Sequence, residues 1–229
     1  TEDAIIKFVD MIENSLGKKL HVASVFIDVT KAFDSCDHNI IIKKLERIGL
    51  EGKSLDLMKS YLKDRTQLVQ VNGVNGGTFI INIGVGQGTI LGPTLFKIYI
   101  MDLHKHTVLD CVKFADDTNL IGVGKTREEV EILINSELSK VQNWFNNNKL
   151  TLHPAKSRFI IHSRDKLIQL RMGGHNIERV GYGLQEESVK FLGIHIDENL
   201  DWKIHMQKVR SKVSKGNYLL WRHGRKLTE

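Results

Sequence analysis

Apolar positions along the chain alternate between helical spacing and short continuous runs. An apolar residue at every third or fourth position predicts an amphipathic helix, whereas a short apolar run bounded by turn residues predicts a strand. The helices that this pattern predicts are 4–16, 40–48, 55–62, 95–103, 126–147 and a basic helix from about Ile204. The strands that it predicts are 22–29, 67–72, 78–84, 111–115, 118–123, 158–162, 166–172 and 189–196.

Two pairs of predicted strands are close enough in sequence to form hairpins. The glycine-rich segment 72–77 joins the first pair, and Asp116 and Asp117 alone separate the strands 111–115 and 118–123. Two residues are the length of a tight hairpin turn. Helices therefore alternate with hairpins rather than with single parallel strands. This order predicts an α+β fold with helices packed on an antiparallel sheet.

The sequence predicts one continuous structural unit. No repeat or proline-rich linker divides its 229 residues, of which only two are proline. A hydrophobic content of 41% is enough for a substantial core. The helical pattern begins almost at Thr1, which is not a methionine, so we expect a fragment of a longer polypeptide.

Positive charge is concentrated near the end of the chain. Of the 33 Lys and Arg residues, eight lie between Lys203 and Lys226, where no acidic residue occurs, so that 25 basic residues stand against 27 acidic residues elsewhere. A basic segment on a nearly neutral body fits binding to a phosphate backbone. A membrane surface, an acidic partner or a solvated helix face would also explain it.

Cysteine usage and hydropathy indicate the compartment. Cys36 and Cys111 cannot form a disulfide framework and lack the spacing of a zinc site, which fits a reducing intracellular setting. The sequence contains no apolar run of membrane-spanning length and no signal-peptide pattern. We therefore expect a soluble protein without a membrane partner.

Three aspartates stand at the ends of predicted strands. Asp116 and Asp117 occupy a predicted turn, where Asp is common for conformational reasons alone. Their flanking strands are apolar enough to be central in a sheet, and adjacent carboxylates repel each other unless a cation compensates. Asp28 lies near the end of the strand 22–29, where it either caps the next segment or binds a partner. Such carboxylates are suitable ligands for Mg²⁺.

Four glycines crowd the segment 84–93 ahead of an apolar helix. Glycine allows a backbone to approach a ligand closely, although a plain flexible loop would have the same composition. The spacing fits neither a P-loop nor a dinucleotide-binding loop.

Together these elements resemble the motifs of reverse transcriptases of non-LTR retrotransposons of the jockey-like kind. Segment 26–34 (FIDVTKAFD) resembles their first catalytic motif, 87–93 (QGTILGP) their second and 114–117 (FADD) their third. Segment 150–156 (LTLHPAK) is similar to the fourth motif, and 191–197 (FLGIHID) is similar to the primer-grip motif. The motifs occur in the family's order and cover nearly the whole chain.

The resemblance implies a polymerase palm with partial fingers over residues 1–202 and the start of the thumb, a basic helix, over 203–229. It implies RNA-directed DNA synthesis in which Asp28, Asp116 and Asp117 are catalytic and hold two Mg²⁺ ions, for which Mn²⁺ can substitute. One ion would activate the primer 3′-hydroxyl and the other would bridge the phosphates of the incoming nucleotide. Asp28 and Asp116 are expected to be the least replaceable.

Further roles follow from the same resemblance. Phe33 would lie beneath the nucleotide sugar and exclude a ribose 2′-hydroxyl, and Gln87 and Gly88 would contact the nucleotide. Lys156 would neutralise or protonate the leaving pyrophosphate. Phe33 is alternatively a core residue at the start of a helix, and Lys156 is alternatively an ordinary surface lysine.

Phe191, Leu192 and Gly193 would form a turn that grips the primer, although Phe191 also fits a core position. The basic helix would follow the backbone of the template–primer duplex by shape, with a grip that weakens as salt rises. Its contributing residues would be Lys203, Lys208, Arg210, Lys212 and Lys215.

The implied partners are an RNA template, a DNA primer and deoxynucleoside triphosphates. The resemblance also implies other domains of a longer polyprotein, with most of the fingers upstream of this chain. The expected location is intracellular, in the nucleus and cytoplasm as a ribonucleoprotein.

The sequence departs from the family pattern at two positions. Gly86 stands where proline is usual, and His153 stands where asparagine is usual. These departures leave open a polymerase relic that binds nucleic acid without catalysis. An RNA-dependent RNA polymerase would also hold catalytic metal ions through such acids, but Phe33 and the segment 114–117 favour reverse transcription. A basic adaptor domain whose acids are only surface turns is a third alternative.

Overall fold

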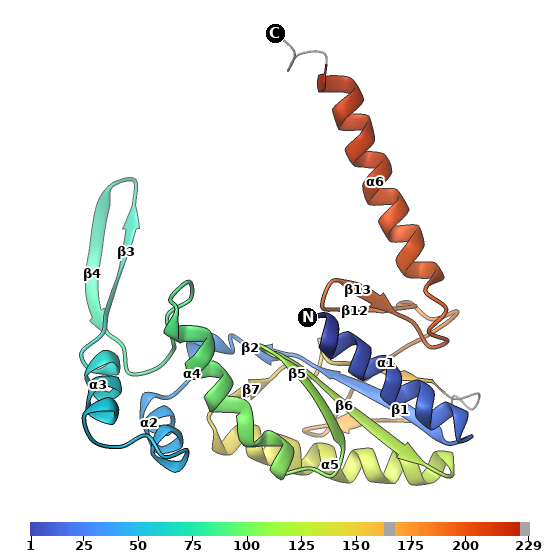
Figure 1. Ribbon diagram of the computed structural model, residues 1–229, viewed down its shortest axis with the longest axis horizontal. Helices are drawn as coiled ribbons and strands as arrows, with labels where there is room; N and C mark the ends of the chain where they lie inside the picture. The colour runs from blue at the N-terminus through green and yellow to red at the C-terminus, as the bar shows by residue number, and fades with distance from the viewer. Residues whose placement is uncertain (163–167, 225–229) are drawn as a thin grey trace.

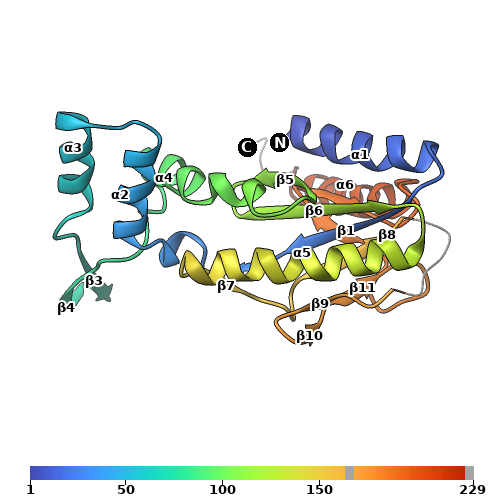
Figure 2. The same ribbon diagram turned by 90° about the horizontal axis from the view of Figure 1, so that it is seen from below.

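The computed structural model of the chain describes residues 1–162 and 168–224. A five-stranded sheet, in the order β11-β8-β1-β6-β5, forms its centre (Figure 1). Helix α1 (Glu2–Gly17) covers one face of this sheet and α5 (Arg127–Asn147) covers the other, as Figure 2 shows. The strands are β1 (His21–Ile27), β5 (Asp110–Phe114), β6 (Asp117–Gly124), β8 (Arg158–Ile161) and β11 (Glu178–Val180).

Strand β1 is the central strand, and six of its seven residues are buried. Because successive side chains of a strand point to opposite faces, β1 contributes to two separate cores. Val25 and Ile27 belong to the larger hydrophobic cluster, which includes the apolar stripe of α5. Val22 and Phe26 belong to a second cluster that includes Phe8 of α1. The two helices therefore hold the sheet between them.

The strand pairing confirms the α+β class and corrects one detail of it. Strands β1, β5, β6 and β8 pair with their neighbours in antiparallel fashion, whereas β11 runs parallel to β8. The sheet is therefore mixed rather than purely antiparallel. The apolar pattern did not predict β11, because a three-residue edge strand carries too few positions for a period to appear.

The remaining elements extend the body on either side. The helices are α2 (His38–Arg47), α3 (Gly52–Leu62), α4 (Leu91–Ile100) and α6 (Lys203–Gly224), with short 3₁₀ turns η1 (Phe33–Ser35) and η2 (Met101–Lys105). Four two-stranded ladders complete the fold. They pair β3 (Thr66–Val71) with β4 (Val74–Ile80), β2 (Val29–Thr30) with β7 (Thr151–Leu152), β9 (Arg171–Met172) with β10 (His175–Asn176), and β12 (Val189–Phe191) with β13 (Ile194–Ile196).

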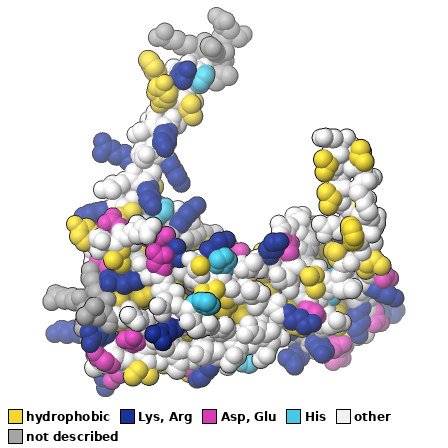
Figure 3. All heavy atoms as spheres, turned by 180° about the vertical axis from the view of Figure 1, so that it is seen from behind, with side chains coloured by type: hydrophobic (Ala, Val, Ile, Leu, Met, Phe, Trp, Pro, Cys, Tyr) yellow, Lys and Arg dark blue, Asp and Glu magenta, His cyan; other side chains and the backbone are white. Residues whose placement is uncertain are grey.

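Two elements project from the same side of the body. The β3–β4 hairpin stands at one end and α6 at the other, and Figure 3 shows an open trough between them. Both projections carry exposed apolar side chains, among them Phe79 (67% exposed) and Trp221 (74% exposed). At the base of α6, Leu200 and Trp202 have positive φ angles of 55° and 63°. No helix in the described ranges combines the length and apolarity that a membrane crossing needs.

Predicted helices and observed helices agree closely, whereas three predicted strands were too long, among them 78–84, which ends at Ile80. The predicted strand 22–29 ends at Ile27, and Val29 and Thr30 pair with β7 instead. The predicted strand 189–196 is a hairpin that turns at Leu192 and Gly193, whose φ angles are 48° and 93°. The residues around this turn are apolar, so the sequence pattern did not reveal it.

Two further predictions need correction or completion. The predicted loop 72–77 is a two-residue turn at Asn72 and Gly73, with φ angles of 49° and 81°. Positive φ at both central residues is typical of the tight turns that match strand twist, so the strand resumes at Val74. Of the predicted strand 166–172, only Arg171 and Met172 form a strand, and part of the prediction lies outside the described residues.

A buried polar network joins α2, α4 and the end of α5. The Asp37 carboxylate caps α2 by accepting hydrogen bonds from the backbone N–H groups of Asn39 and Ile40, and it forms a 2.7 Å ion pair with Lys149. The Tyr99 hydroxyl accepts from the Asp37 backbone N–H and donates to the Asn148 carbonyl at 2.6 Å. The network therefore fixes α2, α4 and the end of α5 relative to one another.

We expect Asp37→Asn to lower the free energy of unfolding by about 1–2 kcal/mol at pH 7, because the cap acceptor remains while the ion pair with the exposed Lys149 is lost. Burial raises the pKa of Asp37, but hydrogen bonds from Lys149 and the helix N–H groups outweigh it and hold the pKa below its usual value. A depressed pKa stabilises the fold above the unfolded-state pKa, and this contribution is lost as pH falls through the folded-state pKa.

Urea unfolding at pH 7 and pH 3 provides the measurement. The difference between wild type and Asp37→Asn should narrow at the lower pH. Asp10→Asn, at an exposed position on α1, is the matched control and should change little. A difference that stays constant with pH would contradict the role of the carboxylate charge.

Candidate active site

The pairing of β1 with β6 brings two of the predicted acids to one edge of the sheet. Ile27 and Thr118 are register partners, so Asp28 follows the end of β1 beside Asp117 at the start of β6. Asp116 occupies the turn before β6. The turn itself is shifted by one residue from the prediction, because Phe114 pairs with Asp117 and the turn residues are Ala115 and Asp116.

The backbone of Asp28 is held on both sides. Its N–H donates to the Ser157 hydroxyl at 3.2 Å, and its carbonyl accepts from the His153 N–H at 2.9 Å. His153 acts here through its backbone N–H, so this contact does not depend on the type of its side chain. The turn between His153 and Ser157 also carries Lys156, whose side chain is exposed. The predicted leaving-group lysine therefore belongs to the turn that is hydrogen-bonded to the Asp28 backbone.

Negative charge accumulates at this edge. Burial raises the pKa of Asp117, and the charges of Asp116 and Asp28 raise it further. No lysine or arginine in the described ranges forms an ion pair with any of the three carboxylates. Within those ranges, no group of three Asp, Glu, His or Cys side chains already has a metal-holding arrangement. Hard carboxylate oxygens that lack a counter-charge nevertheless fit a divalent cation in donor chemistry.

A cavity of about 420 Å³ opens beside Asp116. It brings this acid together with three residues predicted to contact a nucleotide, namely Phe33, Gln87 and Gly88. Its other lining residues are Val29, Lys31, Ala32, Gly86 and Pro93. Residues separated by more than eighty positions in the sequence therefore share one cavity, as the resemblance implied.

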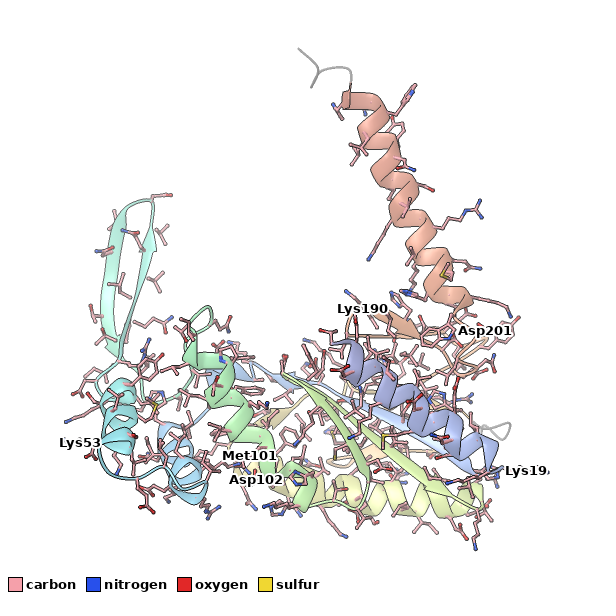
Figure 4. The ribbon with its side chains drawn as sticks, viewed as in Figure 1. Lys19, Lys53, Met101, Asp102, Lys190 and Asp201 are labelled. Carbon is pink, nitrogen blue, oxygen red and sulfur yellow. The ribbon has the colours of Figure 1, made fainter. Side chains whose placement is uncertain are left out.

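Phe33 has a packed face as well as a cavity face. Its ring stacks on Phe96 of α4 with a centroid distance of 4.5 Å and an interplanar angle of 20°. It also borders a second cavity of about 430 Å³ that reaches Met101, labelled at the lower end of α4 in Figure 4. Phe33 therefore packs on one face like a core residue and lines a cavity on another, and the stack fixes the position of the ring.

Glycine is required in the loop that carries Gln87. Gly84 has φ +89°, and a Cβ there would lie 3.1 Å from the Asp34 carbonyl oxygen. A Cβ on Gly92 would lie 2.2 Å from the Gly86 carbonyl oxygen. Side chains at these positions would force the loop away from the rest of the cavity wall.

Some predicted site residues lie away from the acids. Phe191 is 3% exposed and packs on Phe8 and Phe26 with centroid distances of 5.5 and 6.0 Å, so it is a core residue. Leu192 and Gly193 do form the predicted turn. Of the three predicted primer-grip residues, Leu192 and Gly193 therefore remain candidates for contact with a primer. Phe191 lies in the core beside the turn.

The predicted backbone-binding residues of α6 are all exposed. Figure 3 shows Lys and Arg side chains along the projecting helix, and Asp201 at its base is labelled in Figure 4. Lys203 forms a 2.6 Å ion pair with Asp201, and Lys208 lies 3.1 Å from His195 Nδ1. The other three, Arg210, Lys212 and Lys215, lie further along the helix.

Sequence reasoning missed three residues that contact the site from outside. Ser157 bonds the Asp28 backbone, Asp34 accepts a hydrogen bond from Gln87, and His38 bonds the Gly84 carbonyl. Asp34 and His38 contact residues about fifty positions further along the chain. No local period or composition could have revealed such contacts.

Comparison with known proteins supports one family. The family model described as reverse transcriptase (RNA-dependent DNA polymerase) matches residues 3–196. The RNA-directed DNA polymerase from the mobile element jockey of Drosophila melanogaster is 25% identical over 96% of this chain and 25% of its own length. The probable RNA-directed DNA polymerase from transposon BS of the same organism is 27% identical over 100% of this chain. The chain thus spans about a quarter of these relatives, 25% and 26%.

Solved structures agree at the level of the fold. A telomerase from Candida tropicalis aligns with 87% of this chain and 32% of its own, with a TM-score of 0.58 and 13% identity. A telomerase from Candida albicans aligns with 86% of this chain at a TM-score of 0.57. The similarity in fold is consistent with the family match over most of the chain. This chain belongs to the reverse transcriptase (RNA-dependent DNA polymerase) family.

Proposed function

We propose that the chain is the polymerase part of a non-LTR retrotransposon protein and extends a DNA primer on an RNA template. The observation that carries this proposal is the convergence of Asp28, Asp116 and Asp117 at one sheet edge, beside a cavity that contains Phe33 and Gln87. A surface-turn origin of the acids would not require this convergence.

The three carboxylates would hold Mg²⁺, with Mn²⁺ as a substitute. When bound, such ions stabilise the attacking and leaving oxygens of an in-line phosphoryl displacement. The chain's own contribution is to place the acids. Asp28 is fixed by the bond that its N–H donates to the Ser157 hydroxyl and by the bond that its carbonyl accepts from the His153 N–H. Burial and the charges of Asp116 and Asp28 raise the pKa of Asp117, and a bound cation would offset this negative charge. Lys156, on the neighbouring turn, would neutralise the leaving pyrophosphate.

The cavity would receive a deoxynucleoside triphosphate. Phe33 would lie against the sugar, because its ring is exposed to the cavity on one side and held by Phe96 on the other. Gln87 and Gly88 would contact the nucleotide from the facing wall. Gly88 has φ +81° and open space where a Cβ would lie, which allows a close approach of the backbone.

The two projecting elements define how a duplex would bind. Residues 1–202 would form the palm with partial fingers, including the β3–β4 hairpin, and 203–229 would begin the thumb. The trough between the hairpin and α6 would receive the template–primer duplex (Figure 3). The exposed basic residues of α6 would contact its phosphates, and the turn at Leu192 and Gly193 would contact the primer. Residues 225–229 lie outside the described residues.

The remaining proposals concern the context of the chain. Because the matched relatives are about four times longer, other domains of a polyprotein would flank it. Action within a ribonucleoprotein would follow from the proposed RNA template, and its location in the nucleus and cytoplasm is proposed from the family resemblance alone. The competing hypothesis is a relic that binds nucleic acid without catalysis, and the first experiment below separates the two.

We expect Asp116→Asn to reduce Mg²⁺-dependent primer extension on an RNA template by at least about a thousandfold, because a metal-ligating charge is lost. The assay compares this chain, a version extended in both directions and the variant of each. Binding of primed template by the variant is the control for folding. DNA synthesis that survives the substitution would reject the proposal, and binding without synthesis by the extended wild type would favour the relic.

Phe33→Val should raise ribonucleotide incorporation relative to deoxynucleotide incorporation by about ten- to a hundredfold, because a smaller side chain leaves room for a 2′-hydroxyl. Steady-state incorporation of matched ribo- and deoxynucleotides measures the ratio. Phe96→Leu is the comparison variant, since it removes the ring that stacks on Phe33 while the Phe33 side chain itself remains. Unchanged sugar selectivity in an active Phe33→Val enzyme would remove Phe33 from this role.

Asp117→Asn should raise the melting temperature by about 1–3 °C in EDTA at pH 7. The pKa of Asp117 is raised in the folded state, so its contribution favours folding only below the unfolded-state pKa and turns unfavourable as pH rises. Mg²⁺ should raise the melting temperature of the wild type more than that of the variant. Asp110→Asn, at the other end of β5, is the matched control. Equal Mg²⁺ responses in all three proteins would argue against a cation at this edge.

A further inference from the structure

The loop that carries Gln87 is fastened to the turn that carries Phe33. Four hydrogen bonds connect the two segments, although about fifty residues separate them in sequence. They are Val85 N–H to Phe33 carbonyl at 2.8 Å, Gly84 N–H to Cys36 carbonyl at 2.7 Å, His38 Nε2 to Gly84 carbonyl at 2.8 Å, and Gln87 Nε2 to Asp34 Oδ1 at 3.0 Å. The two segments that line the cavity are therefore directly connected.

Three of these bonds involve the loop backbone and place the loop, whereas the fourth acts on a side chain. The Gly84 bonds hold the loop so close that a Cβ at Gly84 would contact the Asp34 backbone. This close approach brings Gln87 within reach of the Asp34 carboxylate. The bond between Asp34 and Gln87 thus sets the direction of an amide that lines the cavity.

The chemistry of the pair determines which amide atom faces the cavity. An ionised carboxylate only accepts hydrogen bonds, whereas a glutamine amide has a donor end and an acceptor end. Asp34 can therefore bind only the Nε2 end of Gln87. The Oε1 end and the second N–H remain available to a ligand.

We propose that Asp34 is a positioning residue that orients the Gln87 amide toward the incoming nucleotide. The inference rests on the proposed function for its ligand and on the hydrogen bonds above for its geometry. Asp34 is not part of the acid cluster, since the charges that raise the pKa of Asp117 are those of Asp116 and Asp28. Its side chain lines neither of the two cavities beside Phe33. Asp34 acts through Gln87 rather than on the substrate.

Asp34→Asn is the informative substitution. It keeps the shape of the side chain but no longer requires Gln87 to present its Nε2 end. An asparagine can offer either a donor or an acceptor, so Gln87 can bind it in either amide orientation. We expect the KM for deoxynucleotides to rise about three- to tenfold, the range for the net contribution of an ordinary hydrogen bond, while kcat changes less.

A double-mutant cycle tests whether Asp34 acts through Gln87. Primer extension is measured for wild type, Asp34→Asn, Gln87→Ala and the double variant in the chain extended in both directions. Asp34→Asn should raise KM in the wild-type background and should have no further effect beside Gln87→Ala. Asp56→Asn, an exposed position on α3, controls for the loss of one negative charge. Additive effects of Asp34→Asn and Gln87→Ala on KM would overturn the inference.

A second measurement does not depend on activity. The side-chain amide protons of Gln87, assigned by NMR with the Gln87→Ala variant, should show one proton shifted by its bond to Asp34, and Asp34→Asn should remove this shift. Identical Gln87 amide signals in wild type and Asp34→Asn would overturn the inference. If the wild type makes no DNA, the proposed function fails while the amide signals still decide the role of Asp34.

Discussion

The register between β1 and β6 is the constraint on which the site depends. With Ile27 opposite Thr118, the acids that follow β1 and precede β6 meet at one edge of the sheet. Because side chains alternate along a strand, a slip of one residue would exchange the faces of the whole strand. Val25 and Phe26 would then point into the wrong cores, and the two hydrophobic clusters together hold the register. Core packing on both faces of β1 therefore determines where the carboxylates lie.

Hydrogen bonds and an ion pair hold the surroundings of the negatively charged edge in place. Asp28 is bonded through its backbone to the turn at 153–157, and Asp37 and Tyr99 join the neighbouring helices. Mutual repulsion of carboxylates would otherwise favour rearrangement of the loops. The hydrogen bonds and the ion pair that hold this edge in place are thus made by groups that do not themselves line the cavity.

Local pattern predicted the long helices and the acid hairpin well. The stripe from Val130 to Phe145 lies on α5, and the apolar runs around Asp116 became β5 and β6. The pattern failed where turns lie within apolar sequence. Leu192 adopts positive φ in a run that resembles one strand, and the turn before Asp117 is shifted because Ala115 takes the positive φ. Single residues in this conformation leave no periodic trace.

The sequence predicted less of the candidate site than of the fold. The resemblance identified the three acids and Phe33, and the cavity joins Asp116 and Phe33 to Gln87. Contacts made by Ser157 and His38 could not be predicted, since they depend on segments far apart in sequence. Phe191 shows the opposite case, because a motif position is a core residue in the fold.

The attachment of α6 has a mechanical consequence. This helix has 22 residues and a length of about 33 Å, and it stands away from the body above two left-handed residues, Leu200 and Trp202. The tip of α6 therefore lies far from the point at which the helix joins the body. A rotation of about 10° at the base would displace the tip by about 6 Å, given that length. Small dihedral changes at two residues would thus set the width of the trough opposite the β3–β4 hairpin.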